Sequence, residues 1–252
     1  MIWLRSVLFN IAFFGTTALV AILSTPVLLA PPHWTMPPIR FWAWLVVQEL
    51  RWICGIRLRV LGREHLPQRG AALVAAKHQS ALDTLVWLLL VPDCAYVLKQ
   101  ELLRIPFYGF LVAKVGMIPV DREGGAAAMR HLLKSGKAAA AAGRQLVIFP
   151  EGTRVAPGDR VPYQPGIAAL AAATGLPVIP VATDSGMLWG RRAFLKRPGT
   201  ITISVLPALP AGLPRPVLIE RLETLIEAES DRLMARRPVD KTVDDFAASP
   251  SP

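Results

Sequence analysis

The sequence is poor in charged residues and in cysteine. Charged residues make up 18% of the 252 residues, against about 25% in a typical soluble domain, while hydrophobic residues make up 53%. Such an apolar chain can fill a hydrophobic core, which excludes an intrinsically disordered protein. The two cysteines, Cys54 and Cys94, have no metal-ligand spacing and make no disulfide framework, so a reducing compartment is indicated.

Three common catalytic motifs are also missing. The chain contains no Gly-x-Ser-x-Gly, no His-Glu-x-x-His and no Gly-x-x-x-x-Gly-Lys-Ser/Thr pattern. These absences weigh against a serine hydrolase with a nucleophile elbow, a zinc protease and a P-loop nucleotidase.

Positive charge is in excess, because 28 Lys and Arg residues face 18 Asp and Glu residues, giving a net charge of +10. Residues 214–252 hold more acidic than basic side chains, so the excess lies in residues 1–213. A basic body on an apolar chain indicates an anionic membrane surface or a phosphorylated ligand as partner. No long basic run with interleaved aromatic residues is present, so no nucleic-acid partner is expected.

The N-terminal segment resembles a membrane anchor. No Lys, Arg, Asp or Glu occurs from Ser6 through Ile39, and residues 7–29 are almost entirely apolar. A helix of about 20 such residues matches the hydrocarbon thickness of a bilayer. A signal peptide is the alternative, although Arg5 alone is a thin basic region and Leu28 is not the small residue that cleavage before Pro31 would require.

A second apolar segment, residues 41–47, is too short to span a bilayer and is expected to be an interfacial helix. Trp42 and Trp44 of this segment, and Trp52 after it, are expected at headgroup level. Arg51, Arg57, Arg59 and Arg63 then follow. By the positive-inside rule this flank predicts that residues 1–55 attach the protein to the cytoplasmic face of a membrane, as in a bacterial inner membrane.

The rest of the chain alternates between short apolar strands and helices. We predict strands at residues 71–76, 95–98, 117–120, 145–149, 177–182 and 200–206, and helices at 81–90, 125–142, 165–173 and 216–235. The alternation predicts an α/β fold with a mixed, largely parallel sheet flanked by helices, over residues 56–236. Residues 237–252 are expected to be a disordered tail.

His78 and Asp83 are the first candidates for chemistry. If His78 lies on the turn after a strand and Asp83 in the first turn of the next helix, the carboxylate can orient the imidazole and stabilise its charged form. The other ring nitrogen could then take a proton from a hydroxyl group. The alternative is purely structural: Ser80 and Asp83 could cap the helix, with His78 a solvated turn residue.

Other polar residues follow further strands. Glu151, Gly152, Thr153 and Arg154 come after the strand at 145–149, and this turn could hold an anion; a surface turn with Arg154 paired to Glu151 is the alternative. Lys99 and Arg122 follow two more strands, and each alone could be a solvated surface charge. Since ligands of open α/β sheets bind at the carboxyl ends of the strands, the combination predicts a pocket for a phosphorylated alcohol.

These segments together resemble the 1-acylglycerol-3-phosphate acyltransferases of the glycerolipid acyltransferase family. The chain is similar to that family in HQSALD (78–83), in GMIPVDR (116–122), in FPEGTR (149–154) and in VIPVA (178–182), with KQELLRIPFYG (99–109) between the first two. The resemblance covers about residues 60–205. It departs from the family at Lys77, where Asn is usual, and at Val155, where Ser is common.

The resemblance implies an acyl transfer without an acyl-enzyme. His78 is the implied general base for the sn-2 hydroxyl of lysophosphatidic acid, oriented by Asp83, and the alkoxide attacks the thioester of an acyl-CoA or acyl-carrier protein. Phosphatidic acid is the implied product. Arg122 and the turn of Glu151, Gly152, Thr153 and Arg154 are implied to bind the acceptor, with Lys99 as a further phosphate contact. No metal or other cofactor is implied.

Two alternatives stay open. The acceptor could be another lyso-lipid, such as a lyso-ornithine lipid, because the same base could serve a different headgroup. The chain could also be a non-catalytic lipid-binding or scaffold protein of the membrane, which would need the anchor and the basic surface but not His78.

Overall fold

The computed structural model describes residues 1–31, 34–105, 108–235 and 246. Its centre is a seven-stranded sheet with the order β1-β7-β6-β2-β5-β3-β4. The strands are β1 Ile56–Leu61, β2 Ala72–Ala76, β3 Cys94–Lys99, β4 Ile118–Val120, β5 Gln145–Ile148, β6 Val178–Thr183 and β7 Gly199–Val205. Neighbouring strands are parallel except β6 and β7, which are antiparallel. The predicted α/β class with a mixed, largely parallel sheet is confirmed.

Strand β1 was not among the predicted strands. Its sequence alternates apolar and basic residues, with Ile56 and Leu58 buried and Arg57 and Arg59 partly exposed, which is the pattern of a strand at a sheet edge. In the sequence these arginines are interpreted only as a charged flank of the membrane segment. The strand pairs in parallel with β7, a partner far along the chain that no local sequence pattern predicts.

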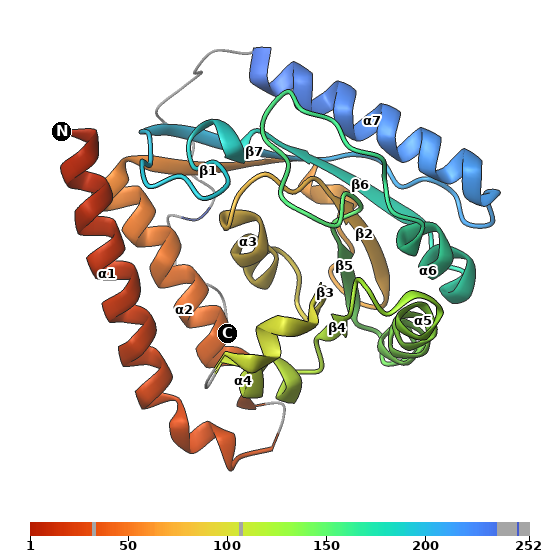
Figure 1. The fold of residues 1–252 in the computed structure, drawn as a ribbon, viewed down its shortest axis with the longest axis horizontal. Helices are drawn as coiled ribbons and strands as arrows, with labels where there is room; N and C mark the ends of the chain where they lie inside the picture. The colour runs from red at the N-terminus through yellow and green to blue at the C-terminus, as the bar shows by residue number, and fades with distance from the viewer. Residues whose placement is uncertain (32–33, 106–107, 236–245, 247–252) are drawn as a thin grey trace.

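Helices cover both faces of the sheet (Figure 1). One face carries α3 Leu82–Leu90, with α2 Met36–Glu49 packed against it, and α4 Tyr108–Lys114. The other carries α5 Gly125–Ala141, α6 Gly166–Thr174 and α7 Arg215–Ala235. Shorter helical turns complete the described chain: η1 Thr25–Leu28, η3 Leu50–Cys54, η4 Arg63–His65, η5 Gln100–Arg104 and η6 Ser185–Met187.

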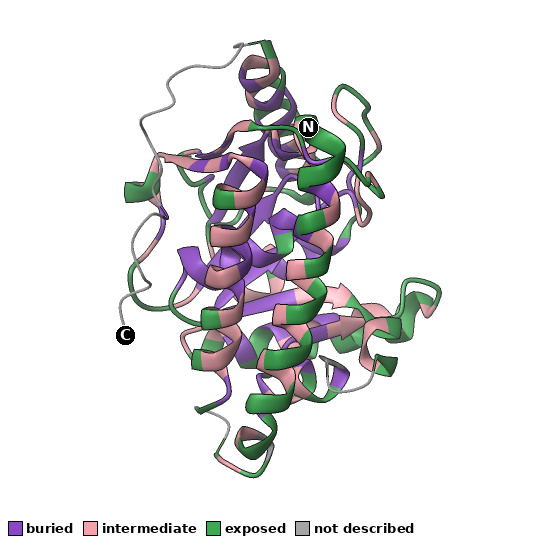
Figure 2. Cartoon of the chain, turned by 90° about the vertical axis from the view of Figure 1, so that its left-hand side faces the viewer, coloured by how far each residue is buried: buried purple, intermediate pink, exposed green. Residues whose placement is uncertain are grey.

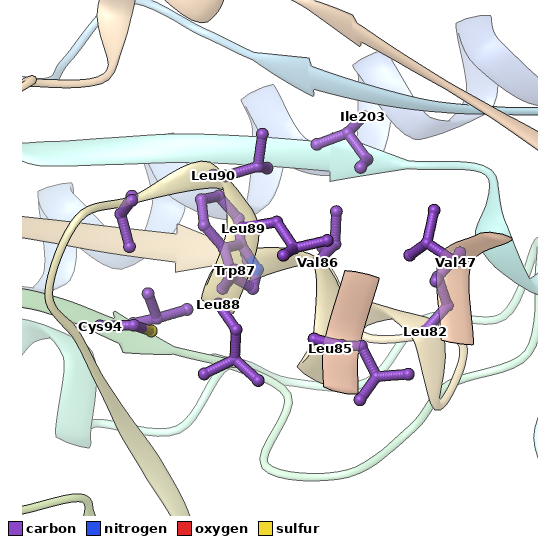
Figure 3. Packing of buried hydrophobic residues seen from close by; sticks show 14 of the residues in the cluster. Val47, Leu82, Leu85, Val86, Trp87, Leu88, Leu89, Leu90, Cys94 and Ile203 are labelled. Carbon is purple, nitrogen blue, oxygen red and sulfur yellow. The ribbon is translucent and has the colours of Figure 1, made fainter. Parts of the chain in front are cut away.

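The two faces bury separate hydrophobic clusters because side chains of a strand alternate between them. In β2, Val74 belongs to the cluster under α3 and Leu73 to the cluster under α5, α6 and α7. Helix α3 is buried almost all round, and Figure 3 shows its Trp87 and leucines in one buried cluster with Val47 of α2 and Ile203 of β7. This packing fixes the start of α3, where the candidate histidine and aspartate lie. Cys54 and Cys94 are both buried and unpaired.

Helix α1 Ile2–Leu23 lies beside α2 at one side of the molecule (Figure 1). It is long and apolar enough to cross a membrane, and in Figure 2 most of its surface is exposed or only partly buried. Only Ser6 and Phe9 are buried. The structure therefore contains one apolar N-terminal helix of the expected length, which is a weak indication of membrane association.

Helix α2 packs one face into the protein. Ala43, Val46 and Val47 are buried in the core, and the indole N–H of Trp42 donates a hydrogen bond of 3.0 Å to Thr17 of α1. Trp42 thus joins the two helices, whereas Trp52 is 75% exposed, as a headgroup-level side chain would be. The predicted tail, residues 237–252, lies outside the described residues apart from Phe246, whose carbonyl accepts a hydrogen bond from Gln48.

Candidate active site

The carboxyl ends of four parallel strands share one edge of the sheet. Strand β2 leads to His78, β5 to Glu151, β3 to Lys99 and β4 to Arg122. Because β2, β5, β3 and β4 are neighbours in the sheet, the topology places these segments along one edge.

His78 and Asp83 converge as their spacing predicts. The chain leaves β2 at Ala76, turns, and enters α3 at Leu82, so that Asp83 lies in the first helical turn. His78 Nδ1 lies 3.2 Å from Asp83 Oδ2, within hydrogen-bond distance. The same oxygen accepts hydrogen bonds from the backbone N–H groups of Gln79 (2.6 Å) and Ser80 (2.7 Å). Asp83 therefore holds the turn that leads into α3 and faces the imidazole at once, so the catalytic and structural interpretations are not exclusive.

The imidazole of His78 is held from its flat side as well. The ring stacks on Phe149 with a centroid distance of 4.2 Å and an angle of 23° between the planes. Its side chain keeps 12% of its surface exposed. Within the described residues Nε2 has no hydrogen-bond partner, so this nitrogen is available to a substrate hydroxyl.

The turn after β5 is hydrogen-bonded to the backbone of His78. Glu151 Oε1 accepts a hydrogen bond of 3.2 Å from the His78 N–H, and the N–H of Val155 donates one of 2.8 Å to the His78 carbonyl. Gly152 has φ +67°, a left-handed conformation that glycine adopts without strain, and this closes the turn. The segment predicted to hold an anion thus also fixes the candidate base.

Glu151 is buried, with 3% of its surface exposed. Burial raises the pKa of its carboxyl to about 7, although the nearby Lys77 ammonium, 3.5 Å away, opposes the rise. No ion pair joins Glu151 to Arg154 among the described residues, so the surface-pair alternative for this turn does not describe the structure. Glu151 instead turns inward, toward Lys77.

The candidate cations differ in their surroundings. Arg154 is partly buried, and among the described residues its guanidinium forms no hydrogen bond or ion pair, as an anion-binding group would before its ligand arrives. Thr153 beside it is partly exposed. Arg122 is exposed, and Lys99 is an exposed residue paired with Glu101 at 2.8 Å. Neither Arg122 nor Lys99 forms a hydrogen bond or ion pair with His78 in the described part of the chain.

Two side chains near the site carry roles that sequence reasoning missed. Lys77, noted only as a departure from the family motif, is 2% exposed and pairs with Glu227 of α7 at 2.6 Å. Glu227 borders the apolar stripe of α7, next to Ile226, and this position beside buried residues is a sequence signal that could have drawn attention to it.

Comparison with known proteins places this geometry in context. The family described as Acyltransferase matches residues 57–184. The chain is 36% identical over 196 residues to a 1-acyl-sn-glycerol-3-phosphate acyltransferase of Pseudomonas aeruginosa, covering 78% of this chain and 74% of that one. A protein of the same name from Limnanthes douglasii is 31% identical over 63% of this chain and 56% of its own length. The crystal structure of the acyltransferase PlsC from Thermotoga maritima superposes with a TM-score of 0.79 and 21% identity, over 95% of this chain and 100% of that one.

Proposed function

Because the chain belongs to the acyltransferase family, we propose that it transfers a fatty acyl group to the sn-2 hydroxyl of 1-acylglycerol-3-phosphate and releases phosphatidic acid. The observation that carries this proposal is the His78–Asp83 pair at the strand edge that also bears Arg122 and Arg154. A base on the same edge as two arginines that have no ion pair among the described residues suits a phosphorylated alcohol.

The proposed reaction begins with removal of the acceptor's hydroxyl proton by Nε2 of His78. Asp83 keeps the neutral ring in the tautomer that leaves Nε2 free, and its charge stabilises the imidazolium that forms. The oxygen attacks the thioester carbonyl, and the tetrahedral intermediate expels the thiolate, which takes up the proton held by His78. General-base catalysis of this kind contributes roughly 10² to 10⁴ in rate.

The acceptor phosphate is assigned to the cations of the edge. Arg154 offers a planar fork of donors and has no competing partner among the described residues, while Gly152 and Thr153 complete the turn. Arg122 and Lys99 add positive charge at the same edge. The carboxylate of Glu151 is committed to the His78 N–H, so its assigned part in acceptor binding is to hold the turn.

The donor is an acyl-CoA or an acyl-carrier protein, and the membrane is the source of the acceptor. Both the acceptor and the product are amphiphiles, so a site on a membrane-attached protein avoids moving acyl chains through water. The apolar surface of α1 supports attachment, and the basic residues that follow α2 support the cytoplasmic face.

The test is a matrix of donors and acceptors with the purified full-length protein. We expect release of CoA or carrier thiol, and formation of phosphatidic acid, with 1-acylglycerol-3-phosphate as acceptor. His78→Ala should lose most of this turnover, and His131→Ala, an exposed histidine of α5, serves as the matched control.

Two results would contradict the proposal. Turnover with a lyso-ornithine lipid but not with 1-acylglycerol-3-phosphate would assign a different acceptor. No thiol release with any lyso-lipid would favour a non-catalytic membrane protein.

A further inference from the structure

A buried group of charged side chains connects the C-terminal helix α7 to the candidate active site. Lys77 Nζ donates hydrogen bonds to both carboxylate oxygens of Glu227, at 2.6 and 2.7 Å, and lies 3.5 Å from Glu151 Oε1. Lys77, Glu151 and Glu227 are exposed by only 2%, 3% and 4%. These charges have been removed from water, so each depends on the others for compensation.

The group ends on the backbone of the candidate base. Glu151, which lies close to the Lys77 ammonium, accepts a hydrogen bond from the His78 N–H. Lys77 also precedes His78 directly in the chain, and its own N–H donates a hydrogen bond of 2.8 Å to the carbonyl of Val181 in β6. A shift of Lys77 or Glu151 would therefore move the backbone from which the imidazole projects.

Glu227 is the most fully bonded member of the group. Besides Lys77, the hydroxyl of Tyr163 donates a hydrogen bond of 2.9 Å to its Oε1. The buried face of α7, including Leu222 and Ile226, holds the helix against the rest of the core, so the carboxylate is presented from a rigid element. Buried ion pairs add little net stability compared with apolar packing, so the contribution of this pair is a fixed geometry.

We propose that Glu227 is a positioning residue for His78, acting through Lys77 and Glu151. The inference rests on the proposed function, in which His78 is the base. Glu227 lies beyond the family match at residues 57–184, and Lys77 stands where Asn is usual in the family that the motif resembles. An Asn could not neutralise a buried carboxylate. The charges of Lys77 and Glu227 are therefore compensated only when both residues are present.

The experiment compares four full-length variants with the wild type: Glu227→Gln, Lys77→Asn, the double variant, and Glu220→Gln as a control. Glu227→Gln keeps the shape of the side chain, and Glu220→Gln removes one exposed charge from the same helix. Since small displacements at a reacting centre cost roughly 10²-fold, Glu227→Gln should lower kcat about 10-fold or more with both KM values within about twofold. The control should match the wild type.

Two further readouts separate positioning from mere stability. The ring nitrogens of His78, followed by NMR of ¹⁵N-histidine-labelled protein and assigned with His78→Ala, should shift in Glu227→Gln and not in Glu220→Gln. The double variant should lose no more kcat than Lys77→Asn alone, because the two residues act as one unit.

The outcomes distinguish this inference from the proposed function. An active wild type with unchanged kcat and unchanged His78 resonances in Glu227→Gln overturns the positioning role alone. Equal losses in Glu227→Gln and Glu220→Gln, or a loss that follows the melting temperature and leaves the His78 resonances in place, also overturns it. A wild type that turns over no lyso-lipid overturns the proposed function, and the role of Glu227 in that catalysis with it.

Discussion

Asp83 uses a single oxygen atom for three neighbours: the His78 ring and the N–H groups of Gln79 and Ser80. Its charge and its shape therefore have separate consequences. The position of the oxygen holds the turn that leads into the helix, and the amide oxygen of an Asn could accept the same two hydrogen bonds. The charge stabilises a protonated imidazole, which an amide cannot do.

Replacing Asp83 by Asn separates these two roles. We expect Asp83→Asn to lower kcat by roughly 10² to 10⁴, the range typical of lost acid–base assistance. The free energy of unfolding should change by less than about 1 kcal/mol, because the amide oxygen of Asn can accept the same two backbone hydrogen bonds. Steady-state kinetics and urea denaturation measure both quantities, with Asp159→Asn as an exposed control. An equal loss of stability and activity would make Asp83 a structural residue only.

The raised pKa of Glu151 predicts that the free energy of unfolding depends on pH. Burial raises its pKa from 4.5 to about 7, so the folded state holds a proton that the unfolded chain has already released. The stabilisation from this group is complete below about pH 4.5 and is lost as the pH rises through 7. Urea denaturation of wild type should thus show a larger fall in unfolding free energy between pH 5 and pH 8 than Glu151→Gln shows. Identical pH dependence in the two proteins would contradict the raised pKa.

At the residue scale the sequence was informative over short distances. The spacing of His78 and Asp83 predicted that the two side chains converge, because a strand, a turn and the first turn of a helix leave few arrangements. The partners of Lys77 and Glu151 could not be predicted. Glu227 is 150 residues from Lys77, and only the packing of α7 on the sheet brings them together.

Among the elements, α1 depends on a lysine for its attachment to the rest of the protein. Lys196 is 3% exposed, and its Nζ donates a hydrogen bond of 2.8 Å to Asn10 of α1. It also lies within about 5.5 Å of the ring centroids of Phe9, Trp189 and Phe194, close enough for cation–π attraction. Its backbone N–H donates to Ser6.

Replacing Lys196 by Met should loosen α1 while leaving the sheet folded. Met fills similar volume but provides neither the charge nor the donor, so hydrogen exchange of residues 2–23 should speed up about 10-fold or more, the equivalent of one lost charged hydrogen bond. The strands should exchange as in the wild type. Lys137→Met, at an exposed position of α5, is the control. Unchanged exchange in α1 would show that the contacts with α2, including the Trp42–Thr17 hydrogen bond, hold the helix without Lys196.

Most elements were predictable because they carry their own periodicity. The apolar runs of β2, β5 and β6 and the helical stripe of α7 appear at the expected places. Strand β1 was missed because its arginines had a competing interpretation as a membrane flank. The partial burial of α2 was missed because a short apolar helix looks alike whether it meets lipid or protein.

On the scale of the whole molecule, the apolar surface of α1 stands apart from the basic α/β body. Ile11, Phe14 and Ile22 are exposed by 66%, 68% and 68%, although all are large and apolar. A cluster of this kind on a folded protein indicates contact with a membrane or another apolar partner.

Adding charge to that surface should therefore detach the protein. We expect the triple variant Ile11→Lys, Phe14→Lys and Ile22→Lys to lose most of its sedimentation with phosphatidylglycerol vesicles, although three positive charges would strengthen a purely electrostatic association. Three lysines at exposed alanines of α5, Ala126→Lys, Ala138→Lys and Ala141→Lys, form the matched control. Binding that persists in the α1 variant would place the membrane contact elsewhere.

The pairing of β1 with β7 has a consequence for how the chain is made. Among the described strands, β1 is the first to leave the ribosome and pairs only with β7, the last, so both of its hydrogen-bonding edges stay unpaired until translation has passed residue 205. Closing so long a loop is slow. A nascent chain that stalls before this point would expose a ready template for mispairing, and truncated forms should aggregate where the complete protein folds.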